Sequence, residues 1–298
     1  MTQYIDRFGE QKIQHPVKVF WLSYENNAPA LFGLLILSLL TLLMLLSPLL
    51  APYSANRQFD NYILLPPSWF EGGTINYLLG TDELGRDLFS RLLIGGRTTL
   101  TSALIVVFVS SIVGVFLGLV TTFVGGWLNK LTAYIFDVLL TFPSFVMALL
   151  VIAIIGPGLT HSIFAVMLSL IPHFYKSIKN AITIEIKKPY YVAAKLDGAS
   201  GFTLLFTVLL PNIISTIIIQ ISLSFSTAVL EIATLGFLGF GAQSLVAEWG
   251  AMLGDARSFS FQASWAVWTP GLAILVTVFA INLVGNGIRE SLQSEQYH

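Results

Sequence analysis

One short stretch concentrates the ionisable residues whose spacing could do chemistry. Between Leu79 and Gly95 the sequence carries Asp82, Glu83, Arg86, Asp87 and Arg91. The pairs Asp82–Arg86 and Asp87–Arg91 have the i,i+4 spacing of ion pairs on a helix, each contributing about 0.2–0.5 kcal/mol. Thr81 would then cap that helix. We expect these charges to shape an outer surface rather than to contact a substrate directly.

Two further carboxylates stand inside long apolar stretches. Because a charge in a bilayer is unfavourable, each should face a partner or a cavity. We expect Asp137 to have a structural role, pairing with Lys130 or with a neighbouring helix. Glu231 has two open interpretations. It is either a translocation-path residue that attracts cationic groups, or a helix-end carboxylate that reaches water.

Residue types needed for catalysis or metal binding do not converge. The chain has no cysteine, and its four histidines, His15, His161, His173 and His298, are scattered. No Gly-x-x-x-x-Gly-Lys-Ser/Thr sequence is present that could cradle nucleotide phosphates. We therefore expect no catalytic residues, no metal site and no cofactor in this chain. The net charge of −1 gives no reason to expect a nucleic-acid partner.

The elements that hold these residues are predicted to cross a membrane. Of the 298 residues, 55% are hydrophobic and only 10% are charged, against about 25% charged in soluble domains. Helices are the expected spanning form, because unpaired backbone groups are too costly in lipid. The sequence predicts an all-α integral membrane protein with about six transmembrane helices. The expected spans are 29–50, 98–121, 131–155, 160–178, 208–232 and 267–288, and Pro143, Pro172 and Pro270 are expected to interrupt three of them.

The distribution of lysine predicts the orientation. With six spans, all eight lysines fall on or near the side that holds both termini, which makes that side cytoplasmic. The resulting division has a cytoplasmic N-terminal segment 1–28, a transmembrane domain 29–288 and a cytoplasmic tail 289–298. Within the domain, outer segments are expected at about 51–97 and 233–266, and a cytoplasmic loop at about 179–207.

The cytoplasmic loop contains a short predicted helix. Pro189 suits its first turn, and Gly198 can end it in a left-handed conformation. Ala193 and Ala194 would give the helix a small-residue face that another protein can approach closely, flanked by Lys195 and Asp197. An alternative is a helix that lies on lipid headgroups.

The spacing in this loop resembles the signature of permeases from ATP-binding-cassette (ABC) importers. Ala193-Ala194, three residues, Gly198, nine residues and Val208-Leu-Leu-Pro211 match the family pattern Glu-Ala-Ala, three, Gly, nine, Ile-x-Leu-Pro. Val192 replaces the glutamate, so the resemblance implies no salt bridge there. It implies that this loop docks on an ATPase subunit, with ATP and Mg²⁺ bound by that partner.

The outer segments point to one branch of the family. The stretch from Leu79 to Arg91, with Gly80, Gly85 and the charges above, resembles the Leu-Gly-Thr-Asp-x-x-Gly-Arg-Asp-x-x-Ser-Arg motif of C-type permeases from dipeptide, oligopeptide and nickel importers. The run Leu235–Gln243 and the stretch Glu248–Leu253 resemble their second outer signature. Finer features, among them Leu64–Trp69 and Gly250–Ala256, are similar to the Sap branch, which is associated with antimicrobial peptides.

The resemblance implies a bacterial inner-membrane transport subunit and no enzyme. Its expected partners are a second homologous permease, two ATPase subunits, an outer substrate-binding protein, a peptide and the lipid bilayer. Haem, polyamine or nickel are alternative substrates within the family. A self-contained secondary transporter or a polytopic membrane enzyme are alternatives outside it, and co-purification with an ATPase would separate the permease from both.

Overall fold

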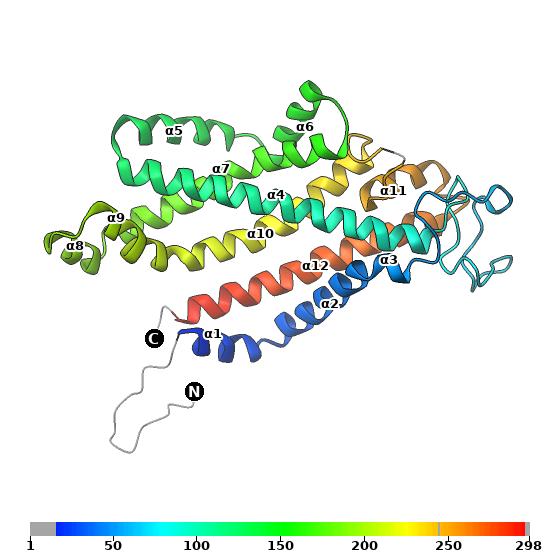
Figure 1. Cartoon of the computed structure of the whole chain (residues 1–298), viewed down its shortest axis with the longest axis horizontal. Coiled ribbons are helices and arrows are strands. Elements are labelled where there is room, and N and C mark those ends of the chain that lie inside the picture. The colour runs from blue at the N-terminus through cyan, green and yellow to red at the C-terminus, as the bar shows by residue number, and fades with distance from the viewer. Residues whose placement is uncertain (1–15, 244, 296–298) are drawn as a thin grey trace, which may run out of the picture.

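The computed structural model describes residues 16–243 and 245–295, and these residues form an elongated bundle of helices (Figure 1). In the described part of the chain the only β-type pairing is an isolated bridge between Thr81 and Asp87. This confirms the prediction of an all-α protein. The longer helices are α1 (Pro16–Glu25), α2 (Ala28–Leu45), α4 (Leu88–Val124), α5 (Gly126–Leu139), α6 (Ser144–Ile155), α7 (Leu159–Glu185), α8 (Pro189–Leu196), α10 (Leu210–Phe237), α11 (Trp249–Ala256) and α12 (Ser264–Glu295).

Short helical segments connect these elements. They are α3 (Ser47–Leu50), α9 (Gly201–Thr203), two 3-10 turns (Asp60–Tyr62 and Arg257–Phe259) and a π-helical stretch (Leu204–Leu209).

Four of these helices are long and apolar enough to cross a membrane. They are α2, α4, the continuous helix 201–237 and residues 264–292 of α12. The α5–α6 pair makes a fifth if it is counted as one broken span. The remaining expected span corresponds to α7. At about 1.5 Å per residue its length is sufficient, but its histidines and lysines leave it less apolar than the others.

The third expected span, 131–155, is not one helix. It breaks into α5 and α6, which are bent by 91° at residues 140–143. Pro143 stands at the break with an extended backbone and precedes the first residue of α6, because proline cannot supply the donor that a continuous helix requires. Helices α7 and α12 continue through Pro172 and Pro270, so neither proline ends its helix.

Several helices extend beyond the apolar runs of the expected spans. The first outer segment is irregular only from residue 51 to 87, and α4 begins ten residues before the expected span. The 179–207 loop is mostly helical. Of the N-terminal segment 1–28, residues 1–15 lie outside the described part. So do residues 296–298 of the tail 289–298, and α12 continues to Glu295.

The bundle has two distinct ends. Helices α8 and α9, helix α1 and the last turns of α12 lie toward one end, and α11, α3 and the 51–87 segment lie toward the other (Figure 1). Close packing along the bundle uses glycine: a Cβ on Gly114 of α4 would lie 2.4 Å from the Cβ of Phe174 on α7. Close contacts between the long helices thus join the two ends of the bundle.

Candidate functional site

Helix α8 begins and ends where its sequence dictates. Lys188 has an extended backbone before it, and Pro189 occupies the first helical position. At the other end Gly198 adopts a φ of +82°. The N–H of Gly198 donates to the carbonyl of Lys195 (3.2 Å), and the N–H of Ala199 donates to that of Ala194 (3.1 Å). These two bonds define a Schellman end, so the short predicted helix is present.

The surface of α8 is open. Among the residues of α8 none is buried, and Leu196 is 82% exposed. A Cβ built on Gly198 meets no atom within 4 Å. Ala193, Lys195, Asp197 and Gly198 are exposed and Ala194 is half-buried, so the predicted contact residues stand together on an accessible element.

Two contacts tie this open helix to the bundle. Tyr191 packs against an apolar cluster of Ile178, Ile182, Leu209 and Ile213, which belong to α7, the π-helical stretch and α10. Beside it, the buried Glu185 accepts hydrogen bonds from Lys188 Nζ (2.7 Å) and from the hydroxyl of Tyr190. Burial, followed by the contact with Glu185, raises the pKa of Tyr190 above its usual value, so this hydroxyl stays a donor. These contacts attach α8 to α7, the π-helical stretch and α10.

Pro211 explains a local irregularity next to the loop. The N–H of Leu210 donates to the carbonyl of Leu205, five residues back, which is the π-helical pattern. Pro211 has no N–H, and its ring would clash with a regular carbonyl four residues earlier. The widened turn relieves that clash. Pro211 therefore lies where the loop joins α10.

The outer motif forms a turn, not a helix. Gly80 and Gly85 have φ of +81° and +69°. A Cβ on Gly80 would lie 2.3 Å from the carbonyl oxygen of Leu65, and a Cβ on Gly85 would lie 2.4 Å from that of Phe59. Thr81 does not cap a helix: its Oγ1 donates to the carbonyl of Tyr62 and accepts from the N–H of Leu65 (2.8 Å). Residues 59–65 therefore pack against this motif.

The charged side chains of this motif are buried together. Asp82 Oδ2 lies 2.6 Å from Arg86 Nε and 3.4 Å from Arg91 Nε. The predicted Asp82–Arg86 pair is present, but Arg91 pairs with Asp82 and not with Asp87. Asp87 instead caps α4, where its Oδ2 accepts from the N–H and the hydroxyl of Ser90 (2.8 and 2.6 Å). The helix starts only at Leu88, which is why the predicted spacing failed.

Asp87 is a buried carboxylate. It is 2% exposed, and its Oδ1 has no hydrogen-bond partner among the described residues. Burial raises the pKa of Asp87, and the hydrogen bonds from Ser90 oppose that rise. The turn therefore contains the Asp82–Arg86–Arg91 ionic cluster and one carboxylate whose pKa is raised by burial.

Glu248 is a structural residue whose role the sequence did not indicate. It is fully buried and accepts hydrogen bonds from Thr99 Oγ1 of α4 and from the N–H groups of Gly250 and Ala251, each at 2.9 Å. A Cβ on Gly236 would lie 2.2 Å from its Oε2. Glu248 thus caps α11 and holds it against α4 and α10. Its partner Thr99 is 149 residues away, so no local pattern could have found it.

The two intramembrane carboxylates have different surroundings. Glu231 is 6% exposed and accepts hydrogen bonds from Ser144 on α6 and from Ser169 on α7 (3.3 Å to the latter). It lies in a contact between three helices, and its role on a translocation path stays a prediction. Asp137 pairs with Lys176 of α7, which confirms a partner on a neighbouring helix.

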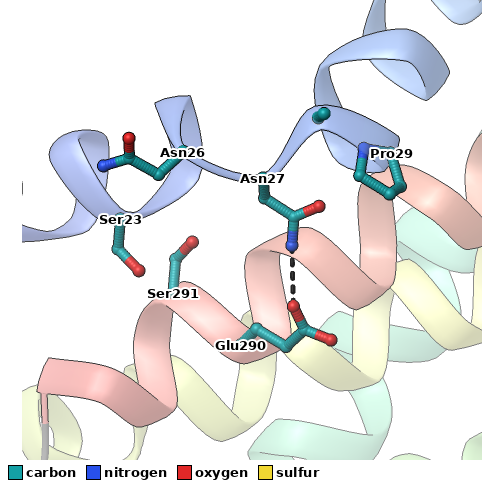
Figure 2. A pocket seen from close by; sticks show the side chains of 7 residues that line it. Ser23, Asn26, Asn27, Pro29, Glu290 and Ser291 are labelled. Atoms are coloured by element: carbon teal, nitrogen blue, oxygen red, sulfur yellow. Dashed lines mark hydrogen bonds between the residues drawn. The ribbon is translucent and has the colours of Figure 1, made fainter.

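A polar hollow of about 400 Å³ lies where α1 and α2 meet the end of α12. Asn27 donates to Glu290 Oε2 across it (2.7 Å; Figure 2), and Asn27 Oδ1 also accepts from the N–H of Ala30 (3.1 Å), capping α2. Among the described residues, no group of three or more His, Asp or Glu side chains is placed to hold a metal ion. The Asn27–Glu290 hydrogen bond thus links the start of α2 to α12 across this hollow.

The comparisons with known proteins decide the family. Residues 110–295 match the family model described as binding-protein-dependent transport system inner membrane component. The chain belongs to this family. Residues 16–67 also match the N-terminal transmembrane domain of oligopeptide transport permease C. The chain is thus a multi-pass inner-membrane transport protein.

Curated relatives resemble this permease over nearly their whole length. The di/tripeptide transport system permease protein DppC of Pseudomonas aeruginosa strain UCBPP-PA14 is 43% identical over 93% of this chain and 91% of its own. The peptide transport system permease protein SapC of Salmonella typhimurium strain LT2 is 40% identical over 96% of both chains. The resemblance to peptide-importer permeases is confirmed.

A solved structure supports the fold. A chain of the MetNI methionine ABC transporter in an inward-facing conformation aligns with a TM-score of 0.56 at 19% identity. The alignment covers 68% of this permease and 96% of that chain. At this identity the likeness concerns the fold alone, and it confirms the ABC-importer permease fold.

Proposed function

We propose that this permease pairs with a second homologous permease to form a path for peptides. Two ATPase subunits, which bind ATP and Mg²⁺, dock on the α8 loops, and an outer binding protein delivers the substrate. The permease itself catalyses no covalent step. The observation that carries the proposal is α8, a well-capped helix with an open small-residue face that is anchored to α7 and α10.

The proposal places α8 and both chain ends on the cytoplasmic side. The excess of lysine at this end supports that orientation,. Ala193, Ala194 and Gly198 contact the ATPase, and Lys195 and Asp197 border the contact. A rigid short helix suits the rigid-body motions by which transporters switch between outward and inward access.

The outer turn presents an apolar edge to the binding protein. Trp69, Phe70 and Ile75 are 63%, 56% and 90% exposed, and they project from the segment that the Asp82 cluster holds. The buried motif residues from Gly80 to Arg91 support this edge and do not form it. Large exposed apolar groups are common at interaction sites.

Peptides are the proposed substrate class because both curated relatives are named for peptide transport. Their similar identities do not separate the Dpp and Sap types, so the Sap branch stays a prediction. Competition by haem, polyamines or Ni²⁺ against peptide uptake would identify the alternative substrates.

The proposed coupling is tested by adding bulk to α8. Ala193→Trp should abolish co-purification of the ATPase and ATP-dependent peptide uptake in proteoliposomes, while membrane insertion is retained. Phe202→Trp is the matched control, because Phe202 is a bulky and 73% exposed residue of the same loop outside α8. Normal assembly and uptake of Ala193→Trp would overturn the proposal.

A further inference from the structure

An ion pair between two helices of the bundle is left open on its outer side. Asp137 of α5 pairs with Lys176 of α7, yet their side chains are 50% and 40% exposed. Next to the pair, α5 packs on α7 through Phe136 and Tyr175, whose ring centroids are 4.5 Å apart. Thr132 Oγ1 lies 3.3 Å from the Tyr175 hydroxyl. The pair thus lies at the edge of a firm helix contact.

This pair lies well along the bundle from the end that carries α8. At about 1.5 Å per residue, Lys176 is roughly 14 Å before the end of α7 at Glu185, and Asp137 is roughly 16 Å from the start of α5 at Gly126. Charges this far along a spanning helix are rare and seldom face lipid. An exposed pair at this position therefore indicates water.

Further exposed polar residues lie near the pair, and an exposed apolar residue lies elsewhere on α5. His173 is exposed one turn from Lys176 on α7, and Thr141 is exposed four residues after Asp137. Ile135 lies two positions before Asp137, which is about 200° around the helix, and it is 47% exposed. Asp137 and Ile135 therefore lie on nearly opposite sides of α5.

We propose that the row of Asp137, Thr141, His173 and Lys176 lines the aqueous path for the peptide on the α8 side of the bundle. An unmodified peptide carries an ammonium and a carboxylate. Asp137 attracts the ammonium and Lys176 the carboxylate, so the two side chains exchange their mutual pairing for the ends of the substrate. This inference rests on the proposed function, and its residues are distinct from the buried Glu231.

Thiol labelling tests whether the row faces water. The chain has no cysteine, so a single introduced thiol reports alone. A charged, membrane-impermeant methanethiosulfonate, added to inside-out vesicles that hold the assembled transporter, should modify Asp137→Cys and His173→Cys at least tenfold faster than Ile135→Cys. Equal rates at positions 135 and 137, or no reaction at 137 and 173, would overturn the proposal.

Uptake of trialanine by the reconstituted transporter tests the charges. Asp137→Asn and Lys176→Gln should each lower uptake at least fivefold without loss of the co-purifying ATPase. The double reversal Asp137→Lys with Lys176→Asp should recover uptake to within twofold of the parent. Normal uptake by both single variants, or no recovery in a double variant that assembles normally, would contradict the proposal.

The experiments distinguish a failure of the proposed transport function from a failure of this inference. If the parent protein shows no ATP-dependent uptake, the transport proposal fails whatever the labelling shows. If the parent transports trialanine and the row is unreactive, only this inference fails.

Discussion

The two ends of the molecule are built on opposite principles. At the end that holds the 51–87 segment, which we propose faces outward, four charged side chains, Asp82, Arg86, Asp87 and Arg91, are buried, and glycines allow backbone to meet backbone. At the α8 end Ala193 and Gly198 are exposed, and a Cβ on Gly198 would meet no atom within 4 Å. A frame that keeps its shape uses internal contacts, whereas a surface that receives a partner, as we propose for α8, leaves its contacts open. Substitutions should therefore destabilise the outer end and uncouple the α8 end.

Asp82→Ala is expected to have the largest effect on stability. Arg86 keeps its ion pairs with Glu83 and Asp255, but the buried Arg91 loses the carboxylate with which it pairs. Leaving a buried charge unpaired costs about 3–5 kcal/mol. The fraction of purified protein that remains monodisperse after heating measures the loss. Glu71→Ala is the control, because Glu71 is an exposed carboxylate of the same segment. Equal melting of the two variants would contradict the role of the cluster.

Gly250→Ala tests the close packing of α11 on α10. The added Cβ would lie 2.0 Å from the carbonyl oxygen of Ala233, and overpacking of this kind costs about 1–3 kcal/mol. Gly271→Ala in α12 is the matched control, since its nearest atom would be 3.9 Å away. The same thermal assay should show a lowered midpoint for the first variant and no loss for the second. A reversed order would show that α11 can shift away from α10.

Gly198→Trp should leave thermal stability nearly unchanged and should disrupt binding of the ATPase. The left-handed backbone at this position disfavours any Cβ by about 1–2 kcal/mol, but no neighbour is displaced, so the melting of the bundle should change little. Co-purification of the ATPase should be lost because the indole blocks the open face. Gly198→Ala carries the same backbone strain without the bulk and should retain the partner. If both variants keep the ATPase, α8 is not the contact.

The stability of the protein should depend slightly on pH through Asp87. Because the pKa of Asp87 is raised in the folded state, the folded protein binds a proton at this site more tightly than the unfolded chain. Its contribution therefore makes the protein more stable as pH falls from the raised pKa toward the ordinary one, and less stable as pH rises. Asp87→Asn should flatten this part of the profile of melting midpoint against pH. Parallel profiles for parent and variant would assign the effect to other carboxylates, such as Glu83.

Local rules predicted the α8 end well and the outer end poorly. Pro189 and Gly198 define a helix through their own backbone preferences, and no distant contact is needed. The outer pairs could not be derived from i,i+4 spacing, because an irregular turn brings Arg91 to Asp82 and leaves Asp87 as a cap. Glu248 depends on Thr99, far away in sequence. Pro143 did indicate the break in the third span, but not its 91° angle.

The most direct test of the account is a single cysteine at Ala193 in native membranes. With no other thiol in the chain, a thiol-specific photo-crosslinker attached at this position should link the permease to the ATPase subunit, and the same probe at Ile75 should link it to the outer binding protein. Modification of the Ala193→Cys thiol by an impermeant reagent added outside intact cells would contradict the account.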